Sequence, residues 1–392
     1  MIYDFDRIID RRGSESVKWH SYGEDALPLW VADMDFPSPE PVIRALRERI
    51  EHGVFGYPRE LPGLRLTLVE RLARLYDWQV EPEALIFLPG VVTGFNLATH
   101  AVTSPGDGVL AQTPVYYPIL YAPGNAGCTL DEMELTRLPD GQYQVDFDLF
   151  EETLTARTRI FILCNPHNPV GRVFRREELE HMAEICLRHD LVICSDEIHC
   201  DLLFTGQQHL PIATLAPEVA ERTITLMAPS KTYNIAGLQC SVAIIENDDL
   251  RKQFVSAKRG LVSWVNLMGQ VAALAAYRDG ESWLAQVLQY LEANRDWLYQ
   301  YVDQQLPGIT MLCPEGTYLA WLDCRELAAT DPSDGSSLPP HRFFLDRAGV
   351  ALNDGATFGR GGEGFVRLNF GCPRPTLVKA LERMKQALAS LG

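Results

Sequence analysis

A lysine in a turn, Lys231, follows a short apolar run at residues 223–227 that is typical of a buried strand. Pro229 ends this run, and Gly237 lets the chain turn close to another group. Lysine is the residue that forms Schiff bases with carbonyl cofactors. A lysine after a strand is more often a solvated loop residue, so the interpretation of Lys231 depends on the rest of the chain.

Three further stretches place glycine or polar residues directly after apolar runs. In residues 89–93, a glycine before a helix start offers free backbone N–H groups that suit a phosphate. Two Asn-Pro pairs in residues 165–171 force a turning backbone that could aim Asn168 into a cleft. Asp196 and Glu197 end a third run, where two carboxylates are costly to bury without a cation partner.

Each of these stretches also has a structural interpretation. The glycine can mark a plain strand-to-helix turn, and the two acids can cap the next element. The spacing of Cys194, Asp196, His199 and Cys200 matches no common zinc pattern, so the sequence predicts no metal site.

A lysine, a carboxylate, an amide donor and a phosphate cradle are together the groups needed to hold pyridoxal 5′-phosphate. The lysine carries the cofactor, and the carboxylate keeps the pyridine nitrogen protonated so that the ring can act as an electron sink. The four stretches in combination are far more specific than any one of them.

The elements that must position these groups alternate between short apolar runs and helical patterns. This alternation predicts an α/β fold, with a mostly parallel sheet covered by helices on both faces and ligands at the carboxyl ends of its strands. Ser38 is a candidate cap for a helix that runs to about residue 52. The predicted strands are residues 85–88, 109–113, 160–164, 191–195, 223–227 and 240–245.

The pattern changes after about residue 246, where helices dominate. A long helix at residues 281–305, strand-like segments at 317–322 and 364–370 and a last helix at 376–391 indicate a smaller α+β domain. We expect residues 1–45 to pack with this small domain, residues 46–280 to form the large domain and residues 281–392 to form the small one.

The composition narrows the classes of partner. The formal net charge is −17 over 392 residues, so nucleic acid and anionic membranes are not expected as partners. Nine scattered cysteines without a framework spacing fit a reducing compartment, and no apolar run approaches the roughly 18 residues of a membrane helix. With no signal-peptide pattern at residues 1–6, the expected location is cytoplasmic.

The order of the motifs resembles a known family. Asn165-Pro166-His167-Asn168-Pro169-Val170-Gly171, Ser195–His199 and Ser230-Lys231 with Gly237 look like the class I/II aminotransferases, which are fold type I pyridoxal-phosphate enzymes. The stretches 30–36, 52–57, 317–323 and 364–369 further resemble the MalY/PatB group of cystathionine β-lyase-type carbon–sulfur lyases.

The resemblance implies a role for each residue that matches the pattern. Lys231 is similar to the Schiff-base lysine, Asp196 to the partner of the pyridine nitrogen, and Asn168 to the donor to the ring 3′-oxygen. His199 occupies the place of an assisting tyrosine, and Tyr116 matches the aromatic residue that stacks on the ring.

The remaining matches concern the phosphate and the substrate. Val91 and Val92 would give backbone N–H groups to the phosphate, and Ser230 would add a hydroxyl. Tyr57 resembles a tyrosine that reaches the phosphate of the neighbouring subunit, which implies a homodimer. Arg367 resembles the arginine that grips the substrate α-carboxylate, a task that suits a guanidinium fork.

The chain departs from the family pattern at the phosphate. Gln239 stands where many relatives have an arginine, and Gly90 and Ala228 stand where many have serine. The cradle therefore lacks a charge and some hydroxyls, and the sequence does not identify a replacement.

The expected activity is α,β-elimination from cystathionine or another cysteine S-conjugate, giving a thiol, pyruvate and ammonia. The residues alone leave an aminotransferase open, and a regulatory protein acting through a protein partner is the non-enzyme alternative. Tyr318, Thr357 and Phe358 could line the distal substrate pocket, although core packing explains the aromatic residues as well. The preferred sulfur amino acid is not predicted.

Overall fold

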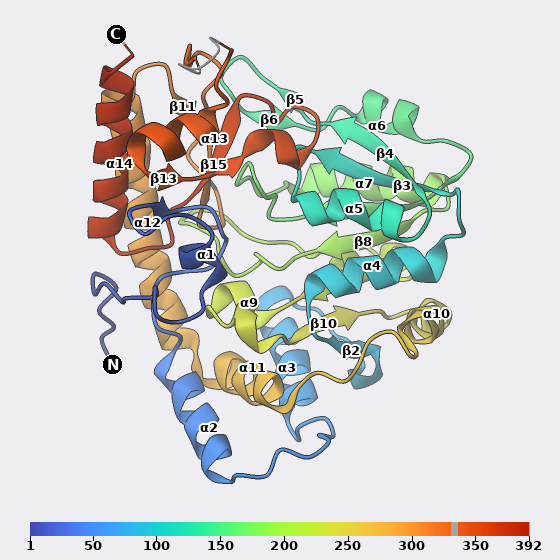
Figure 1. The fold of residues 1–392 in the computed structure, drawn as a ribbon. Helices are drawn as coiled ribbons and strands as arrows, with labels where there is room; N and C mark the ends of the chain where they lie inside the picture. The colour runs from blue at the N-terminus through green and yellow to red at the C-terminus, as the bar shows by residue number, and fades with distance from the viewer. Residues whose placement is uncertain (331–335, 392) are drawn as a thin grey trace.

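The computed structural model describes residues 1–330 and 336–391 and is organised around a seven-stranded sheet of order β2-β10-β9-β8-β7-β3-β4. Neighbouring strands pair in parallel except β10, which is antiparallel to β2 and β9. The predicted mostly parallel sheet is confirmed (Figure 1). Its strands are β2 Leu85–Leu88, β3 Gly108–Thr113, β4 Thr129–Glu134, β7 Thr158–Cys164, β8 Val192–Asp196, β9 Thr223–Met227 and β10 Ser241–Ile244.

Helices cover both faces of this sheet because its strands are apolar on both sides. Along β7, Ile160 and Ile162 pack on one side with helices α4, α5 and α10, whereas Phe161 and Leu163 pack on the other with α6, α7 and α8. These helices are α4 Val91–Val102, α5 Tyr117–Asn125, α6 Phe147–Thr153, α7 Arg176–Arg188, α8 Pro217–Ala220 and α10 Asp248–Lys258.

The β2 end of the molecule is helical. Helix α11 packs against both α2 and α3, and their apolar side chains join a core cluster with β10. The bounds are α2 Glu40–Glu51, α3 Leu64–Tyr76, α9 Pro229–Thr232 and α11 Leu267–Asp279.

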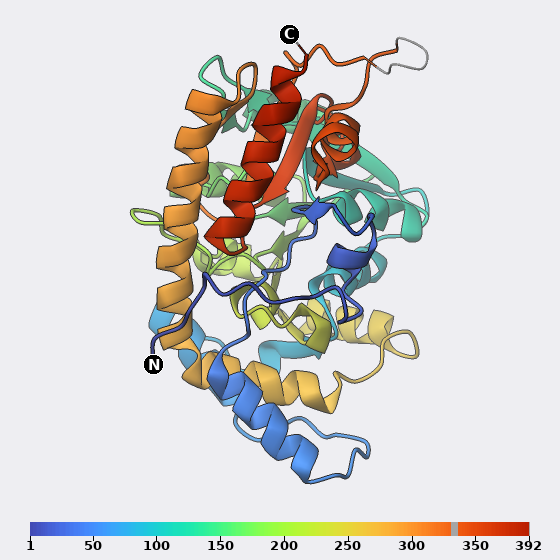
Figure 2. The ribbon, with the colours of Figure 1, turned by 60° about the vertical axis from the view of Figure 1, so that its left-hand side comes forward.

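The long helix α12, Glu281–Gln305, has the bounds predicted from the sequence, and it links this end to a smaller sheet. Figure 2 shows α12 beside the last helix, α14, and the two are in contact. The smaller sheet has the antiparallel order β11-β12-β15-β14. The elements of this part are β11 Thr310–Met311, β12 Leu319–Asp323, α13 Pro340–Phe343, β13 Val350–Ala351, β14 Asn353–Asp354, β15 Phe365–Asn369 and α14 Arg374–Ala389.

The first 38 residues cross from the smaller sheet to α9. They contain α1 Val17–His20 and β1 Leu27–Pro28, which pairs in parallel with β13. Ser38 does not cap α2 as predicted, because that helix begins at Glu40 after Pro39. The Ser38 hydroxyl donates instead to the carbonyl oxygen of Asn234, at 2.9 Å, just beyond α9.

One strand of the large sheet was not predicted from the sequence. Strand β4 lies at the sheet edge, and its sequence, Thr-Leu-Asp-Glu-Met-Glu, is mostly polar because an edge strand needs little apolar surface. A minor ribbon pairs β5 Thr136–Arg137 with β6 Tyr143–Gln144. Among the described residues, none of the helices has the length and apolar character needed to cross a membrane.

Candidate active site

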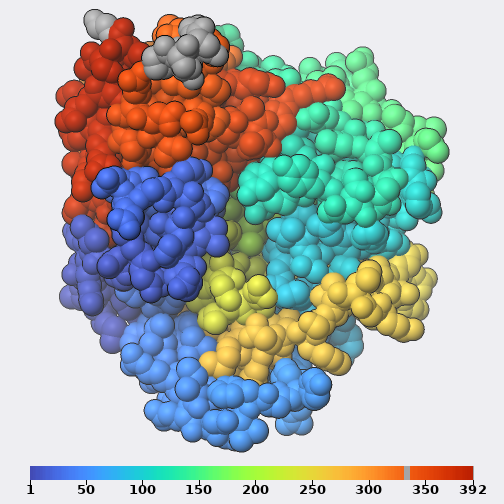
Figure 3. Space-filling view, viewed as in Figure 1, coloured from blue at the N-terminus to red at the C-terminus, as the bar shows by residue number. Residues whose placement is uncertain are grey.

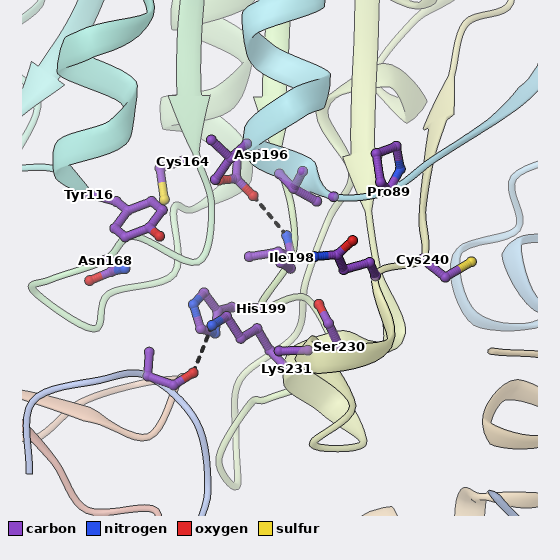
Figure 4. A pocket seen from close by; sticks show the side chains of 16 residues that line it. Pro89, Tyr116, Cys164, Asn168, Asp196, Ile198, His199, Ser230, Lys231 and Cys240 are labelled. Carbon is purple, nitrogen blue, oxygen red and sulfur yellow. Dashed lines mark hydrogen bonds between the residues drawn. The ribbon is translucent and has the colours of Figure 1, made fainter. Parts of the chain in front are cut away.

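A cavity of about 160 Å³ lies where the strands of the large sheet end (Figure 4). Parallel strands bring their carboxyl ends to one edge of a sheet. The antiparallel β10 starts at this same edge, so the residues before it, Gln239 and Cys240, also line the cavity. Eight of the site residues predicted from the sequence line it: Val91, Val92, Tyr116, Asn168, Asp196, His199, Ser230 and Lys231.

Lys231 lies on the short helix α9, just after β9, with its amine in the cavity. Its Nζ donates a hydrogen bond to the carbonyl oxygen of Ala32, at 2.7 Å. Burial, helped by the nearby positive charge of Arg367, lowers the pKa of Lys231 to about 8, against the opposing effects of Asp33 and Asp196. The neutral amine is therefore well populated near pH 8.

Asp196 ends β8 and is only 3% exposed. One carboxylate oxygen accepts a hydrogen bond from the backbone N–H of Ile198, at 3.2 Å (Figure 4). Burial raises the pKa of Asp196 to about 7, against the lowering effects of the Ile198 N–H and of Lys231. A carboxylate this buried, with one weak hydrogen bond among the described residues, is well suited to a cationic partner in the cavity.

Asn168 and Arg367 meet although they come from different sheets. Arg367 on β15 donates through Nη1 to Oδ1 of Asn168, at 3.0 Å. This bond turns the Asn168 amide so that its NH₂ group remains as a donor. Nη2 of Arg367 donates to Oδ1 of Asn353 at 2.6 Å and to the carbonyl oxygen of Trp30 at 3.0 Å. Arg367 thus lies just behind the cavity wall.

Arg367 has one donor to spare. The side chain is almost fully buried, and among the described residues its Nε has no hydrogen-bond partner. Burial lowers the pKa of Arg367 to about 10, so the guanidinium keeps its charge at neutral pH. A buried, unpaired donor on a charged group is costly unless an anion binds there.

Two aromatic rings flank the cavity. His199 is 2% exposed, and burial lowers its pKa to about 3, so it stays neutral. Its Nδ1 has no partner within residues 1–330 and 336–391. Tyr116 also lines the cavity, and burial raises the pKa of its hydroxyl to about 12. Both rings are therefore uncharged near pH 7.

The end of the cavity near β2 is suited to an anion. Helix α4 starts there at Val91, and the first N–H groups of a helix have no acceptor within the helix. The helix can approach β9 closely because Gly94 has no side chain. A Cβ at this position would lie only 2.8 Å from a methyl carbon of Leu226. Ser230 and Gln239 complete this end, and the described lining includes no arginine.

Tyr57 is not brought to the cavity of its own chain. It lies in the loop between α2 and α3 and is fully exposed. The side chains of Val54 and Phe55 in the same loop are also exposed for the most part. Its position within one chain leaves the predicted contact with a second subunit untested.

Several residues that form the site were not predicted from the sequence. Cys164 and Ile198 line the cavity, and Ala32 supplies the carbonyl that holds Lys231. Ala32 lies within the 30–36 stretch that carries the resemblance, but a backbone acceptor has no signal of its own in a sequence. Among the described residues, no group of three His, Cys, Asp or Glu side chains is arranged to hold a metal ion.

Comparison with known proteins agrees with this geometry. The family model for class I and II aminotransferases matches residues 24–384. The chain is 40% identical to cystathionine beta-lyase PatB of Bacillus subtilis, over 98% of this chain and all of that protein. It is 31% identical to protein MalY of Escherichia coli over the full length of both.

Among solved structures, cystalysin of Treponema denticola, which contains pyridoxal 5′-phosphate, matches with a TM-score of 0.94. The two chains are 33% identical and cover each other completely. The residues matched by the family model, 24–384, include both sheets and all of the cavity-lining residues, and the chain therefore belongs to the class I and II aminotransferase family.

Proposed function

We propose that this protein is a pyridoxal 5′-phosphate-dependent carbon–sulfur β-lyase. It cleaves cystathionine or another cysteine S-conjugate, with water, into a thiol, pyruvate and ammonia. The observation that carries the proposal is the placement of Lys231, Asp196 and Asn168 around one cavity at neighbouring strand ends. The similarity to proteins named cystathionine beta-lyase favours elimination over amino transfer.

The groups left unpaired in the cavity fit this cofactor. Asp196 has spare acceptor capacity that a protonated pyridine nitrogen can fill. The NH₂ group of Asn168 is free to donate to the ring 3′-oxygen, because Arg367 already occupies the amide oxygen. The N–H groups of Val91 and Val92 and the hydroxyl of Ser230 suit the phosphate, and Tyr116 and His199 flank the ring.

The cofactor, held covalently by Lys231, supplies an electron sink for the bond broken at the substrate α-carbon. Arg367 binds the α-carboxylate, for which its unpaired Nε is a ready donor. With the cofactor bound, Lys231 would be the group that accepts the α-proton, at Nζ. The lowered pKa of this amine, about 8, makes it an effective base near neutral pH. Asp196 holds the positive charge of the ring nitrogen.

A panel of amino acids tests the reaction. S-substituted L-cysteines should each give pyruvate without an added keto acid, because each carries a β-substituent that can leave. L-alanine carries none and should give no pyruvate under the same conditions. A protein that consumed alanine and the S-conjugates equally, and only with a keto acid present, would be an aminotransferase.

The phosphate end of the site leads to a prediction about Gln239. Its side chain lines the cavity where the described residues place no arginine, so Gln239→Arg should add a charge-assisted hydrogen bond to the phosphate. We expect cofactor affinity to rise roughly 10- to 100-fold, measured by absorbance titration of the cofactor-free protein. Gln239→Met is the matched control, and it should bind no more tightly than the wild type. Equal affinities of the arginine and methionine variants would contradict the assignment of the phosphate to this end.

We also propose a cytoplasmic homodimer in which Tyr57 of each chain reaches the phosphate bound by the other. The support is the full exposure of Tyr57 beside exposed Val54 and Phe55, since such apolar surface favours burial against a second copy. Nine cysteines, none of them paired, support a reducing compartment.

Hybrid dimers test the contact across subunits. Tyr57→Phe should weaken cofactor binding by roughly tenfold, because one hydrogen bond is lost. In a hybrid of a Tyr57→Phe chain with a Lys231→Ala chain, the one complete site combines Lys231 of the first chain with Tyr57 of the second. This site should bind with wild-type affinity, measured by borohydride fixation of the cofactor on Lys231. Weak binding in the hybrid would place Tyr57 in its own chain's site.

A further inference from the structure

The stretch Trp30–Phe36 contains two aspartates that take part in a partly buried charge cluster. Asp35, only 4% exposed, binds Nζ of Lys18 at 2.7 Å and Nη1 of Arg11 at 2.6 Å. Arg11 also holds Asp33, at 2.9 Å, and the indole N–H of Trp19 donates to Asp35 at 2.9 Å. The cluster of Arg11, Lys18, Asp33 and Asp35 thus has two charges of each sign, and the side chain of Lys18 is fully buried.

Stability alone does not account for such a cluster. The desolvation of buried ion pairs offsets most of their attraction, and apolar side chains of similar volume often stabilise a fold as well or better. Directional hydrogen bonds between charged groups do, however, fix the backbone to which they are attached.

The cluster lies next to the carbonyl of Ala32. That oxygen accepts hydrogen bonds from Nζ of Lys231 at 2.7 Å and from the Tyr318 hydroxyl at 2.8 Å. Lys18 also donates to the carbonyl of Asp33, at 3.1 Å. Nδ2 of Asn369 donates to the carbonyls of Val31 and Asp33, at 2.5 and 2.7 Å.

The backbone around Ala32 is therefore held at three successive carbonyls. Side chains donate to the carbonyl of Ala32 itself and to those of Val31 and Asp33 on either side. Figure 4 shows the bond from Lys231 to this part of the chain, and Figure 3 shows the first residues, in blue, packed beside the yellow-green region around α9.

We propose that the cluster of Arg11, Lys18, Asp33 and Asp35 is a positioning device for Lys231. It fixes the Ala32 carbonyl as the acceptor for one N–H of the free amine, so that the lone pair of Nζ faces the cavity. The inference rests on the proposed function, because the orientation of Lys231 matters for catalysis only if this amine carries the cofactor and moves the α-proton.

The same contact stabilises the protonated amine. The charged groups that face Lys231 are Arg367, Asp33 and Asp196, while His199 is neutral and Tyr318 shares the carbonyl. If the carbonyl moves away, the ammonium form loses an acceptor and the pKa of Lys231 falls below its value of about 8. The titration of this one amine therefore reports the position of Ala32.

Two substitutions separate position from charge. Arg11→Lys keeps the charge but loses the fork that grips both aspartates. Asp35→Asn keeps the shape but loses the central carboxylate. The cofactor-free protein is treated with an amine-reactive reagent across a range of pH, and the peptide carrying Lys231 is quantified by mass spectrometry. At pH 6 we expect modification of Lys231 to be roughly tenfold faster in Asp35→Asn and about threefold faster in Arg11→Lys.

Arg295→Met is the matched control, because it removes a partly buried arginine with its ion pairs on α12, and Arg295 does not line the cavity. It should leave the titration of Lys231 unchanged. An Asp35→Asn variant that does not fold leaves the decision to Arg11→Lys, since Arg11 is partly exposed.

The inference is overturned if Lys231 titrates in Arg11→Lys as it does in the wild type. A failure of the proposed function would have a different signature: the wild-type protein, mixed with pyridoxal phosphate and reduced with borohydride, would gain no cofactor mass on Lys231. The amine titration needs no cofactor, so each outcome is read independently.

Discussion

Replacing Lys231 with alanine is expected to abolish both the covalent capture of pyridoxal phosphate and turnover. The change removes the attachment point and the group that accepts the α-proton, which alone contributes roughly 10²–10⁴-fold. We therefore expect a loss of at least about 10⁴-fold in kcat/KM. Absorbance near the visible edge and the mass of the borohydride-reduced protein report the capture, and pyruvate release reports the turnover.

Lys258 provides a matched control for this prediction. It is a partly buried lysine outside the cavity, and its Nζ donates to the carbonyl of Phe87 at 3.0 Å. Burial lowers the pKa of Lys258 as well, so a reactive amine by itself does not distinguish the two residues. Lys258→Ala should retain the absorbance band and activity. Retained turnover in Lys231→Ala, or its loss in Lys258→Ala, would mean that the wrong lysine has been assigned.

Replacing Asp196 with asparagine is expected to damage catalysis while stabilising the cofactor-free protein. The isosteric amide cannot balance the charge of a protonated ring nitrogen, and removing one member of a buried ion pair costs about 3–5 kcal/mol. This corresponds to a loss in kcat of roughly 10²–10⁴-fold. The measurement is the steady-state rate at saturating cofactor.

The stabilising effect follows from the pKa of Asp196, which is about 7 in the folded cofactor-free protein. The ordinary value is near 3.9, so the unfolded chain ionises first and the free energy of unfolding falls as the pH rises from about 4 to 7. Asparagine does not ionise and removes this penalty, which is of the order of 2–4 kcal/mol above pH 7. Denaturant unfolding should show a larger gain at pH 8 than at pH 5.

Glu197, the next residue, is expected to behave in the opposite way. Its carboxylate is fully buried and binds Nε2 of His209 at 2.7 Å and the hydroxyl of Ser195 at 2.9 Å. Glu197→Gln should therefore destabilise the protein, because the buried side chains of His209 and Ser195 would lose the carboxylate that they bind. Equal effects of the two substitutions on stability at both pH values would contradict the raised pKa of Asp196 in the cofactor-free protein.

The sequence predicts the large sheet and its site edge well because both are marked locally. Apolar runs such as residues 160–164 end in Asn-Pro or acidic turns, and these endings mark the carboxyl edge of a parallel sheet. The edge strand β4 has no such signal, since its exposed face is polar. Ser38 carries the composition of a helix cap but uses its hydroxyl on Asn234 instead.

Contacts between distant parts of the chain are what the sequence does not predict. Arg367 reaches Asn168, Asn353 and the carbonyl of Trp30, and these four residues span the first and last parts of the chain. Lys231 is held by a backbone oxygen of Ala32, an acceptor that every residue type offers. The motif at residues 30–36 supports the resemblance, but its physical role becomes clear only when Asp33 and Asp35 are seen with Arg11 and Lys18.

The measurement that tests the central claim most directly is the product balance from L-cystathionine. Purified protein loaded with pyridoxal phosphate is incubated with this substrate and no keto acid, and pyruvate, ammonia and free thiol are each quantified. A β-lyase releases the three in equal amounts, and the Lys231→Ala variant releases none. Consumption of cystathionine only when a keto acid is added, with the amino group transferred to it and no thiol released, would contradict the account.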